Sequence, residues 1–431
     1  MRPSACRPQL EQSWRGLAVR SRGSAGGRRW VGVMMAALLG VASMACIAVP
    51  TIVLVSPAGS ASPTGQRTNI LNSVSCETAT SCFVVGATSI GPNAPVANPA
   101  ITFAGRWNGK TFSALPIPNA PGATSSLLNG VSCTSVKNCF AVGDSVDSNR
   151  HQAALVEQWN GKAWSIVASP KLTYTAMNAV SCTSATFCFA VGQGSTGAET
   201  LVERWNGQKW SLVTSPKPGG SPAELEAVSC VSTKNCSAVG DYSSSVAGEA
   251  LPLFEHWNGK TWSMVAGTRP SAPNPRLTGV ACPSGTTCLA LGSGDTGLLN
   301  SSAPWTARGN GTTWTLVAPA RLTARSAALP TVACASSTDC FAVGSLDNAT
   351  NGEPQPHPLV ERWNGKAWVI IAAARTATGI GGWFNSVSCQ TATTCLAVGA
   401  SVTLINTGGY YRQKTLIERW NGKAWSIVAS S

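Results

Sequence analysis

The dominant feature of this sequence is a unit that recurs seven times and fills nearly everything after residue 70. Each copy carries two cysteines six residues apart, and the first cysteines follow one another at intervals of 48 to 57 residues. A repeat of this length indicates one supersecondary unit that packs against its neighbours along the chain. The pairs are Cys76 and Cys82, Cys133 and Cys139, Cys182 and Cys188, Cys230 and Cys236, Cys282 and Cys288, Cys334 and Cys340, and Cys389 and Cys395.

Each copy contains four short apolar runs that alternate with turn signals. The first two runs are rich in β-forming residues and flank a polar turn of five residues between the cysteines. The last two flank Asn-Gly, a strong hairpin signal because both residues accept positive φ. If Trp159 and Lys162 close a two-residue turn, Trp159 and Trp164 become diagonal neighbours on one face of the sheet. In the fifth copy Gly309 replaces the first tryptophan.

Seven units of four strands predict an all-β fold, a seven-bladed β-propeller of four-stranded antiparallel blades after an N-terminal signal or transmembrane segment. A ring of blades leaves only short exposed strand edges. A solenoid is the alternative, although its repeats are usually shorter. The propeller is expected to span residues 62–431, with repeats that start near residues 71, 128, 177, 225, 277, 329 and 384, and no strand exchange that would lock the ring is apparent.

The first 61 residues have the layout of an export signal. Residues 1–30 form a basic arm, expected to be cytoplasmic, with seven arginines and one acid, and residues 31–55 carry no charge. Residues 31–61 are therefore predicted to be a signal peptide or a membrane anchor, since the apolar run is also long enough to cross a bilayer. Either alternative makes the propeller extracytoplasmic, secreted or anchored by residues 31–55.

In an oxidising compartment we expect local disulfides across the first hairpin of each copy, because the two cysteines of a pair are already close along the chain. Each bridge closes a short loop and is expected to contribute about 2 kcal/mol. Zinc is the alternative, but zinc sites favour closer spacing such as C-x2-C. No metal and no cofactor are predicted.

The formal net charge of +13 includes the basic arm, and the remainder has 24 basic and 17 acidic residues, a net charge of +7. The chain has no dense basic run, so nucleic acid is not an expected partner. Membrane contact is expected only through the N-terminal segment. The protein is expected to be a monomer. Lysines that follow Asn-Gly would form a ring on one face, either as solvated hairpin tips or as a surface for an anionic polymer or membrane. They are Lys110, Lys162, Lys260, Lys366 and Lys423.

The opposite face would carry loops that vary in length between copies, and such loops on a rigid scaffold usually hold the specificity. An exposed aromatic residue near acids and amides suits stacking on a sugar ring, although ordinary loop chemistry is the alternative for each residue. The candidate ligand-binding residues in these loops are Asp144, Arg150, His151, Asp241, Tyr242, Asp295, Trp305, Asp347, Tyr410, Tyr411 and Arg412.

No catalytic residues are predicted. A glutamate two residues before the first tryptophan recurs in five copies, which indicates a structural role, whereas a hydrolytic carboxylate pair is needed only once. The chain has three histidines and no G-x-S-x-G motif. The recurring glutamates are Glu157, Glu203, Glu255, Glu361 and Glu418.

The unit resembles the propeller repeat of the photosystem II stability/assembly factor type, which belongs with the bacterial neuraminidase (Asp-box) repeats. The resemblance rests on the motifs at 178–182, 188–192 and 201–210 and covers residues 70–431. It implies the propeller fold, while such propellers serve as assembly factors, binding modules and sialidases. Two features depart from the pattern: Trp-Asn-Gly replaces the Asp box, and cysteines replace the apolar residues that flank the first turn. The arginine cluster and tyrosine nucleophile of a sialidase cannot be assigned.

The sequence thus predicts an exported, disulfide-reinforced propeller that acts as a non-enzymatic binding or scaffolding module at the cell surface. Its ligand is expected to be a polysaccharide or a protein bound by the variable loops. The alternative is a sialidase-like, glycan-active hydrolase with its site at the propeller axis. A purely structural surface protein is a third possibility.

Overall fold

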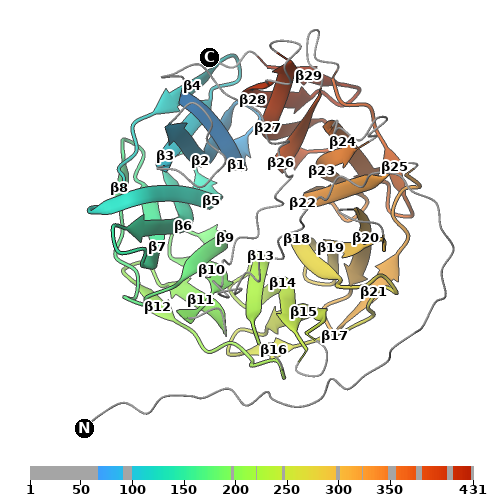
Figure 1. Cartoon of the computed structure of the whole chain (residues 1–431), viewed down its shortest axis with the longest axis horizontal. Coiled ribbons are helices and arrows are strands. Elements are labelled where there is room, and N and C mark those ends of the chain that lie inside the picture. Colours follow the sequence, from blue (N-terminus) through green and yellow to red (C-terminus); the bar gives the residue numbers. More distant parts are fainter. Residues whose placement is uncertain are drawn as a thin grey trace, which may run out of the picture. The chain divides into compact units, whose positions relative to one another are not determined.

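The computed structural model is a ring of seven β-sheets, which confirms the predicted seven-bladed propeller (Figure 1). The structure describes residues 67–90, 100–195, 199–219, 221–244, 248–297, 301–322, 324–347, 356–374, 381–404 and 411–428. The predicted basic arm and export segment lie outside the described residues. Within the described residues, no helix is long and apolar enough to cross a membrane.

Each blade is an antiparallel sheet of four consecutive strands, the first innermost. Blades 1 to 3 comprise β1 (Arg67–Thr78), β2 (Ser81–Ile90), β3 (Ala100–Trp107) and β4 (Phe112–Leu115); β5 (Ala123–Ser135), β6 (Asn138–Asp147), β7 (Gln152–Trp159) and β8 (Trp164–Ile166); and β9 (Ala176–Ser184), β10 (Phe187–Gln193), β11 (Thr200–Trp205) and β12 (Trp210–Leu212). Blade 4 comprises β13 (Ala223–Ser232), β14 (Asn235–Ser243), β15 (Ala250–Trp257) and β16 (Trp262–Met264).

Blade 5 comprises β18 (Arg276–Ser284), β19 (Thr287–Asp295), β20 (Ser302–Gly309) and β21 (Thr313–Val317), with the short β17 (Ala266–Gly267) parallel to β21. Blades 6 and 7 comprise β22 (Ser326–Ser336), β23 (Asp339–Asp347), β24 (Pro356–Trp363) and β25 (Trp368–Ile370); and β26 (Gly381–Thr391), β27 (Thr394–Leu404), β28 (Tyr411–Trp420) and β29 (Trp425–Ile427).

The two cysteines of each repeat form a disulfide across the first hairpin, as predicted. Their Cα atoms are 3.9 to 4.1 Å apart in the seven blades. The turn between them is tighter than the five residues predicted. In blade 3 the strands extend beyond the cysteines to Ser184 and Phe187, which pair with each other. The disulfide therefore lies within the ladder.

The second hairpin is also different from the prediction. Asn160 N–H donates to the carbonyl of Ala163, and Trp159 pairs directly with Trp164, so the loop has four residues and the predicted diagonal arrangement is wrong. The Asn160 side chain causes this geometry, because its Oδ1 accepts the N–H groups of Lys162 and Ala163 at 2.9 and 3.0 Å. Asparagine side chains commonly stabilise turns in this way.

At four interfaces the tryptophan pair of one blade packs against a phenylalanine of the preceding blade. Phe140 of β6 has its ring centroid 5.0 Å from Trp205 and 5.3 Å from Trp210 of blade 3. Tilted and edge-to-face aromatic pairs are stabilising beyond the area that they bury. The same contact is made by Phe83 with blade 2, Phe189 with blade 4 and Phe341 with blade 7.

The interface between blades 4 and 5 is built differently. Ser237 stands where four other blades have phenylalanine and two have leucine. Phe254 of β15 stacks on Trp314 instead, at 5.0 Å between centroids. A Cβ atom at Gly309 would lie 2.9 Å from the Trp314 ring, which explains why this copy lacks its first tryptophan. Trp305 belongs to the same core: it lies in β20 with 6% of its surface exposed, so its assignment to a loop is wrong.

The ring closes by contact between blades 7 and 1. The N–H groups of Val74 and Cys76 donate to Ser386 Oγ and Ser388 Oγ at 3.2 and 3.0 Å. The amide of Asn385 donates to the carbonyl of Leu71 at 2.8 Å. Because serine-to-cysteine bonds of the same kind also join consecutive blades, the closing interface resembles the others, and no strand is exchanged within the described residues.

The five recurring glutamates are fully buried, which supports the predicted structural role. Four of them accept a hydrogen bond from the link that precedes their own blade. In blades 3 and 4 the donor is a serine hydroxyl followed by proline, and in blades 6 and 7 it is a backbone N–H one residue later. The bonds run from Ser169 to Glu203, Ser215 to Glu255, Ala320 to Glu361 and Ala374 to Glu418.

Glu157 of blade 2 has no hydrogen-bond partner at either oxygen. The corresponding link positions are Ile117, which has no hydroxyl, and Pro118, which has no N–H. Burial raises the pKa of Glu157 to about 8, and burial raises the pKa of Glu203, which has a donor, to about 7. Glu157 is therefore mostly protonated when the protein is folded at neutral pH.

We expect the stability of the propeller to fall as pH rises. Because the folded pKa of Glu157 exceeds its ordinary value of 4.5, its contribution is full below pH 4.5 and is lost as pH rises through about 8. Thermal unfolding of Glu157→Gln between pH 5 and 9 should show a weaker pH dependence than the unchanged protein. Pro118→Ala, which supplies the missing N–H, should also weaken it. An identical pH dependence in all three proteins would contradict this account.

Candidate functional site

The antiparallel strands divide the turns between two faces of the ring. The turns between first and second strands and between third and fourth strands share one face, which we call the disulfide face. The connections between second and third strands and the links between blades reach the opposite face, which we call the variable-loop face. The predicted ligand-binding residues were assigned to this second face.

Many of the predicted loop residues belong to strands. Asp144, Asp241, Tyr242, Asp295 and Asp347 lie at or near the ends of second strands, and Asp144 and Asp241 are buried. Arg150 and His151 do lie in a loop, between β6 and β7. Tyr410 lies outside the described residues; Tyr411 and Arg412 begin β28, and their side chains lie outside the description.

The loop before β7 and the link before β9 meet in a cluster that we call the histidine corner. His151 Nδ1 lies 3.1 Å from Asp147 Oδ2, and the N–H of His151 also bonds to Asp147. This backbone bond is the main reason why the pKa of Asp147 lies below its ordinary value. The Tyr174 ring meets His151 edge-on at 5.8 Å between centroids, with 49% of the residue exposed.

Two residues of the histidine corner have left-handed backbones, Arg150 with φ of 66° and Tyr174 with φ of 59°. Such conformations are uncommon outside glycine and are found disproportionately at functional sites. The N–H of Tyr174 is held by the carbonyl of Gln152 at 2.7 Å. The phenol is thus presented to solvent by a fixed backbone. Sequence reasoning did not select Tyr174, because nothing local marks it as left-handed.

Asp144 lies beneath this corner in β6. Gln152 Nε2 donates to its carboxylate at 3.0 Å. Burial raises the pKa of Asp144 to about 6, and the hydrogen bond with Gln152 acts in the opposite direction. The carboxylate therefore orients Gln152 rather than offering itself to a ligand.

A second cluster on the variable-loop face, the acidic corner, lies between blades 4 and 5. Oxygens of Glu224, Glu226 and Asp241 all lie within 4.8 Å of one another. Nη1 of Arg276 lies 3.9 Å from Glu224 Oε1 and 3.7 Å from Asp241 Oδ2. Burial raises the pKa of Asp241 to about 7 and that of Glu226 well above its ordinary range, with repulsion from Glu224 and Asp241 adding to the shift of Glu226.

The acidic corner arises from one departure in the repeat. In four other blades the position of Glu226 holds an asparagine that donates to a carbonyl of the next blade. Comparison of the copies could therefore have revealed Glu226. Arg276, from blade 5, already supplies the positive charge that the carboxylates of blade 4 require, so we assign no metal here. The asparagines are Asn72, Asn129, Asn178 and Asn385.

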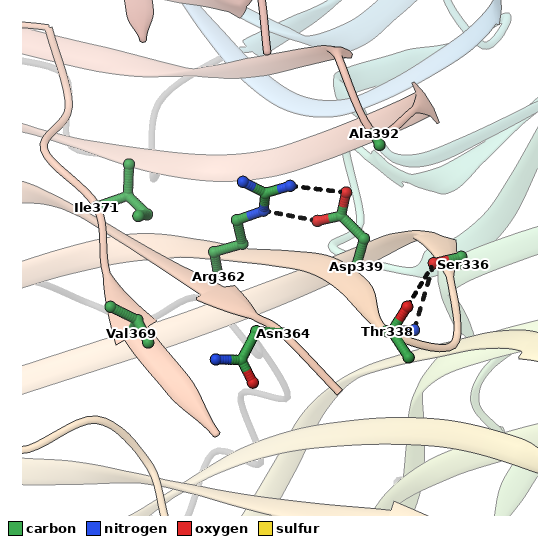
Figure 2. Close-up of a pocket in the computed structure, with 8 residues that line it drawn as sticks. All are labelled: Ser336, Thr338, Asp339, Arg362, Asn364, Val369, Ile371 and Ala392. Atoms are coloured by element: carbon green, nitrogen blue, oxygen red, sulfur yellow. Dashed lines mark hydrogen bonds and ion pairs between the residues drawn. The ribbon is translucent and has the colours of Figure 1, made fainter. Parts of the chain in front are cut away.

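A pocket of about 590 Å³ lies on the disulfide face between blades 6 and 7 (Figure 2). Its polar wall contains Arg362, whose Nε and Nη2 bond to Asp339 at 2.7 and 2.9 Å. Its other wall is apolar. The lining residues are Ser336, Thr338, Asp339, Arg362, Asn364, Val369, Ile371 and Ala392.

No family model matches the chain, and no curated protein matches it. Among solved structures it is similar to YCF48 bound to D1 peptide, with 14% identity, a TM-score of 0.50 and coverage of 84% of this chain and 93% of that one. It is also similar to the polysaccharide lyase PL25 ulvan lyase, unliganded and bound to GlcA(1-4)Rha3S. Both lyase structures have 12% identity and coverage of 87% and 96%, with TM-scores of 0.54 and 0.53. At these identities the chain shares the propeller fold with these proteins.

Removal of Arg276, the cation that lies beside the acidic corner among the described residues, should destabilise the protein. We expect Arg276→Gln to lower the free energy of unfolding by about 1 kcal/mol, because it removes the counter-charge of the carboxylates, although solvent screens the half-exposed guanidinium. The loss should be larger at pH 8 than at pH 5, since the carboxylates ionise as pH rises through their raised pKa values. Adding Glu226→Asn, the residue of four other blades, should restore most of the stability. Equal destabilisation at both pH values would contradict the electrostatic account.

Proposed function

We propose that this protein is an exported, non-enzymatic binding module that holds a polysaccharide or a protein segment at the cell surface through its variable-loop face. The seven disulfides support the extracytoplasmic setting, because such bonds persist in oxidising compartments. The observation that carries the binding site is the exposed Tyr174 ring, fixed edge-on against His151 in the histidine corner.

The chemistry of this corner suits a sugar ring or a peptide side chain. An exposed aromatic face offers apolar contact, and its position is fixed by the backbone rather than by the ligand, which reduces the entropy lost on binding. The imidazole of His151 lies beside the ring, and the neighbouring Arg150 is exposed and carries further hydrogen-bond donors. These residues lie on the scaffold where variable loops usually confer specificity.

Glycan hydrolysis is the second candidate, and one observation favours it. The acidic corner lies on the innermost strand of blade 4, near the propeller axis, and brings carboxylates with raised pKa values close together. Glycoside hydrolysis uses two such carboxyl groups. Arg276 and the partial burial of the cluster favour a structural role, so we rank this function second.

The test is co-sedimentation of the purified protein with cell-wall and extracellular polysaccharides, with released sugar assayed in the supernatant. Retention without release would support the binding module. Release of sugar that Glu226→Gln abolishes would instead establish the hydrolase. If the protein is neither retained nor active, the polysaccharide form of the proposal fails.

Tyr174→Asn should weaken retention by about three- to tenfold, the effect expected from loss of one aromatic contact. Asparagine is a suitable replacement because Asn274 occupies the equivalent position before β18 with φ of 47°. Tyr174→Phe, which keeps the ring, should bind nearly as well as the unchanged protein. Full retention by Tyr174→Asn would place the ligand elsewhere.

A further inference from the structure

Charge is divided unequally between the two faces. The disulfide face carries thirteen arginines and lysines, with at least one in every blade, but its described carboxylates outside the buried core are only Glu77 and Asp339. Burial raises the pKa of Glu77 to about 7, and Asp339 is paired with Arg362. The thirteen are Arg106, Lys110, Lys137, Lys162, Arg204, Lys209, Lys234, Lys260, Arg308, Arg362, Lys366, Arg419 and Lys423.

On the variable-loop face, basic and acidic residues are mixed and often paired. Most carboxylates outside the core lie there, and of six ion pairs between described residues five are on this face. The sixth joins Arg362 and Asp339 on the disulfide face. The positive charges of the disulfide face are therefore concentrated and largely uncompensated, which produces a positive potential over that face.

The lysines of the Asn-Gly turns have fixed backbone positions, and no hydrogen bond or ion pair joins their side chains to another described residue. In the turn of blade 2, the Asn160 side chain holds the backbone N–H of Lys162, and the Lys162 side chain is exposed. Blades 3 and 5 have Gln208 and Thr312 at the same turn position. The turn therefore forms without lysine, although five of the seven blades have one.

A partly buried set of arginines lies behind the lysines. Arg204 places its guanidinium 4.8 Å from the centre of the Phe187 ring. The Nε groups of Arg106, Arg204 and Arg419 are buried without a hydrogen-bond partner. The outer lysines and inner arginines together make a band of positive charge that follows the ring.

We propose that the disulfide face binds a linear polyanion, an acidic polysaccharide that carries carboxylate or sulfate groups. This surface is distinct from the histidine corner and does not depend on the function proposed above. The evenly repeated charges match a polymer of repeated anionic units. The pocket between blades 6 and 7, with polar and apolar walls, lies within this band and is large enough for a sugar ring (Figure 2).

An anionic bilayer fits this surface less well. Proteins that lie on membranes usually insert aromatic or bulky apolar side chains beside their basic residues. Among the described residues of the disulfide face, the exposed large apolar side chains are Val136 and Val231 in the turns and Val369 in the pocket, and none is aromatic. The surface therefore offers charge and hydrogen bonds, the groups that recognise an acidic polymer.

The test compares two five-site variants of the full chain. One changes Lys110, Lys162, Lys260, Lys366 and Lys423 to Gln, the residue that blade 3 already has. The other changes five exposed basic residues of the variable-loop face to Gln and loses the same charge: Lys171, Lys217, Arg269, Arg321 and Arg325. Binding is measured to polygalacturonate, to chondroitin sulfate and to vesicles with 3:7 anionic to neutral lipid. Polygalacturonate and chondroitin sulfate separate carboxylate from sulfate recognition.

We expect the disulfide-face variant to bind at least one polymer about tenfold more weakly, with a shallower dependence of log Kd on log salt, because fewer counterions are released from the polyelectrolyte. The variable-loop-face variant should bind within about twofold of the unchanged protein. Equal losses in both variants, binding to vesicles but to neither polymer, or no binding to any probe would overturn the proposal. Tyr174→Asn should bind the same polymers as tightly as the unchanged protein does, which would show that the histidine corner is not the surface measured.

Discussion

The structure depends on the packing of each blade against the aromatic pair of the next. At four interfaces a phenylalanine makes this contact, as Phe140 does against Trp205 and Trp210. Blades 5 and 7 present Leu289 and Leu396 instead, each in one core with the aromatic pair of the following blade. Neither partner can be buried within its own sheet, so each blade requires its neighbour. The interface of blades 4 and 5 follows the same rule with other residues: where Ser237 and Gly309 leave out two rings, Phe254 and Trp305 fill the core.

Residues that build these interfaces recur from blade to blade, whereas the candidate binding residues differ between blades. Cysteine pairs, Asn-Gly turns and buried glutamates recur because each blade needs the same packing. The histidine and acidic corners occur once each and depart from the repeat, which is the expected distribution for functional or specialised positions. The lysines of the Asn-Gly turns are different, since they recur in five blades although the turn forms without lysine in the other two. Repetition alone therefore does not show that a residue is structural. The contacts of its side chain show whether it stabilises the fold.

The fold could be predicted because the cysteines, tryptophans and turn residues of each repeat mark where its four strands begin and end. Its fine geometry could not, since the four-residue loop depends on the hydrogen bonds of Asn160 and not on Asn-Gly as a dipeptide. The loop assignment of Trp305 is wrong because the fifth copy lacks the first tryptophan that marks this strand; the equivalent position in other copies holds a buried residue such as Leu201 or Leu253. Tyr174 was missed because its left-handed backbone is imposed by a contact with Gln152 that is distant in sequence. Glu226 could have been found by aligning the seven copies.

The central claim is that interlocked aromatic interfaces make the seven blades one cooperative unit. Repeat arrays whose neighbours are weakly coupled lose this property and unfold in stages. The most direct measurement is calorimetric unfolding with the disulfides intact, followed in parallel by tryptophan fluorescence and far-UV circular dichroism. The account predicts one transition in which both signals coincide and the calorimetric and van't Hoff enthalpies agree. Separate transitions, or a van't Hoff enthalpy well below the calorimetric value, would show that the blades are stable alone and would contradict it.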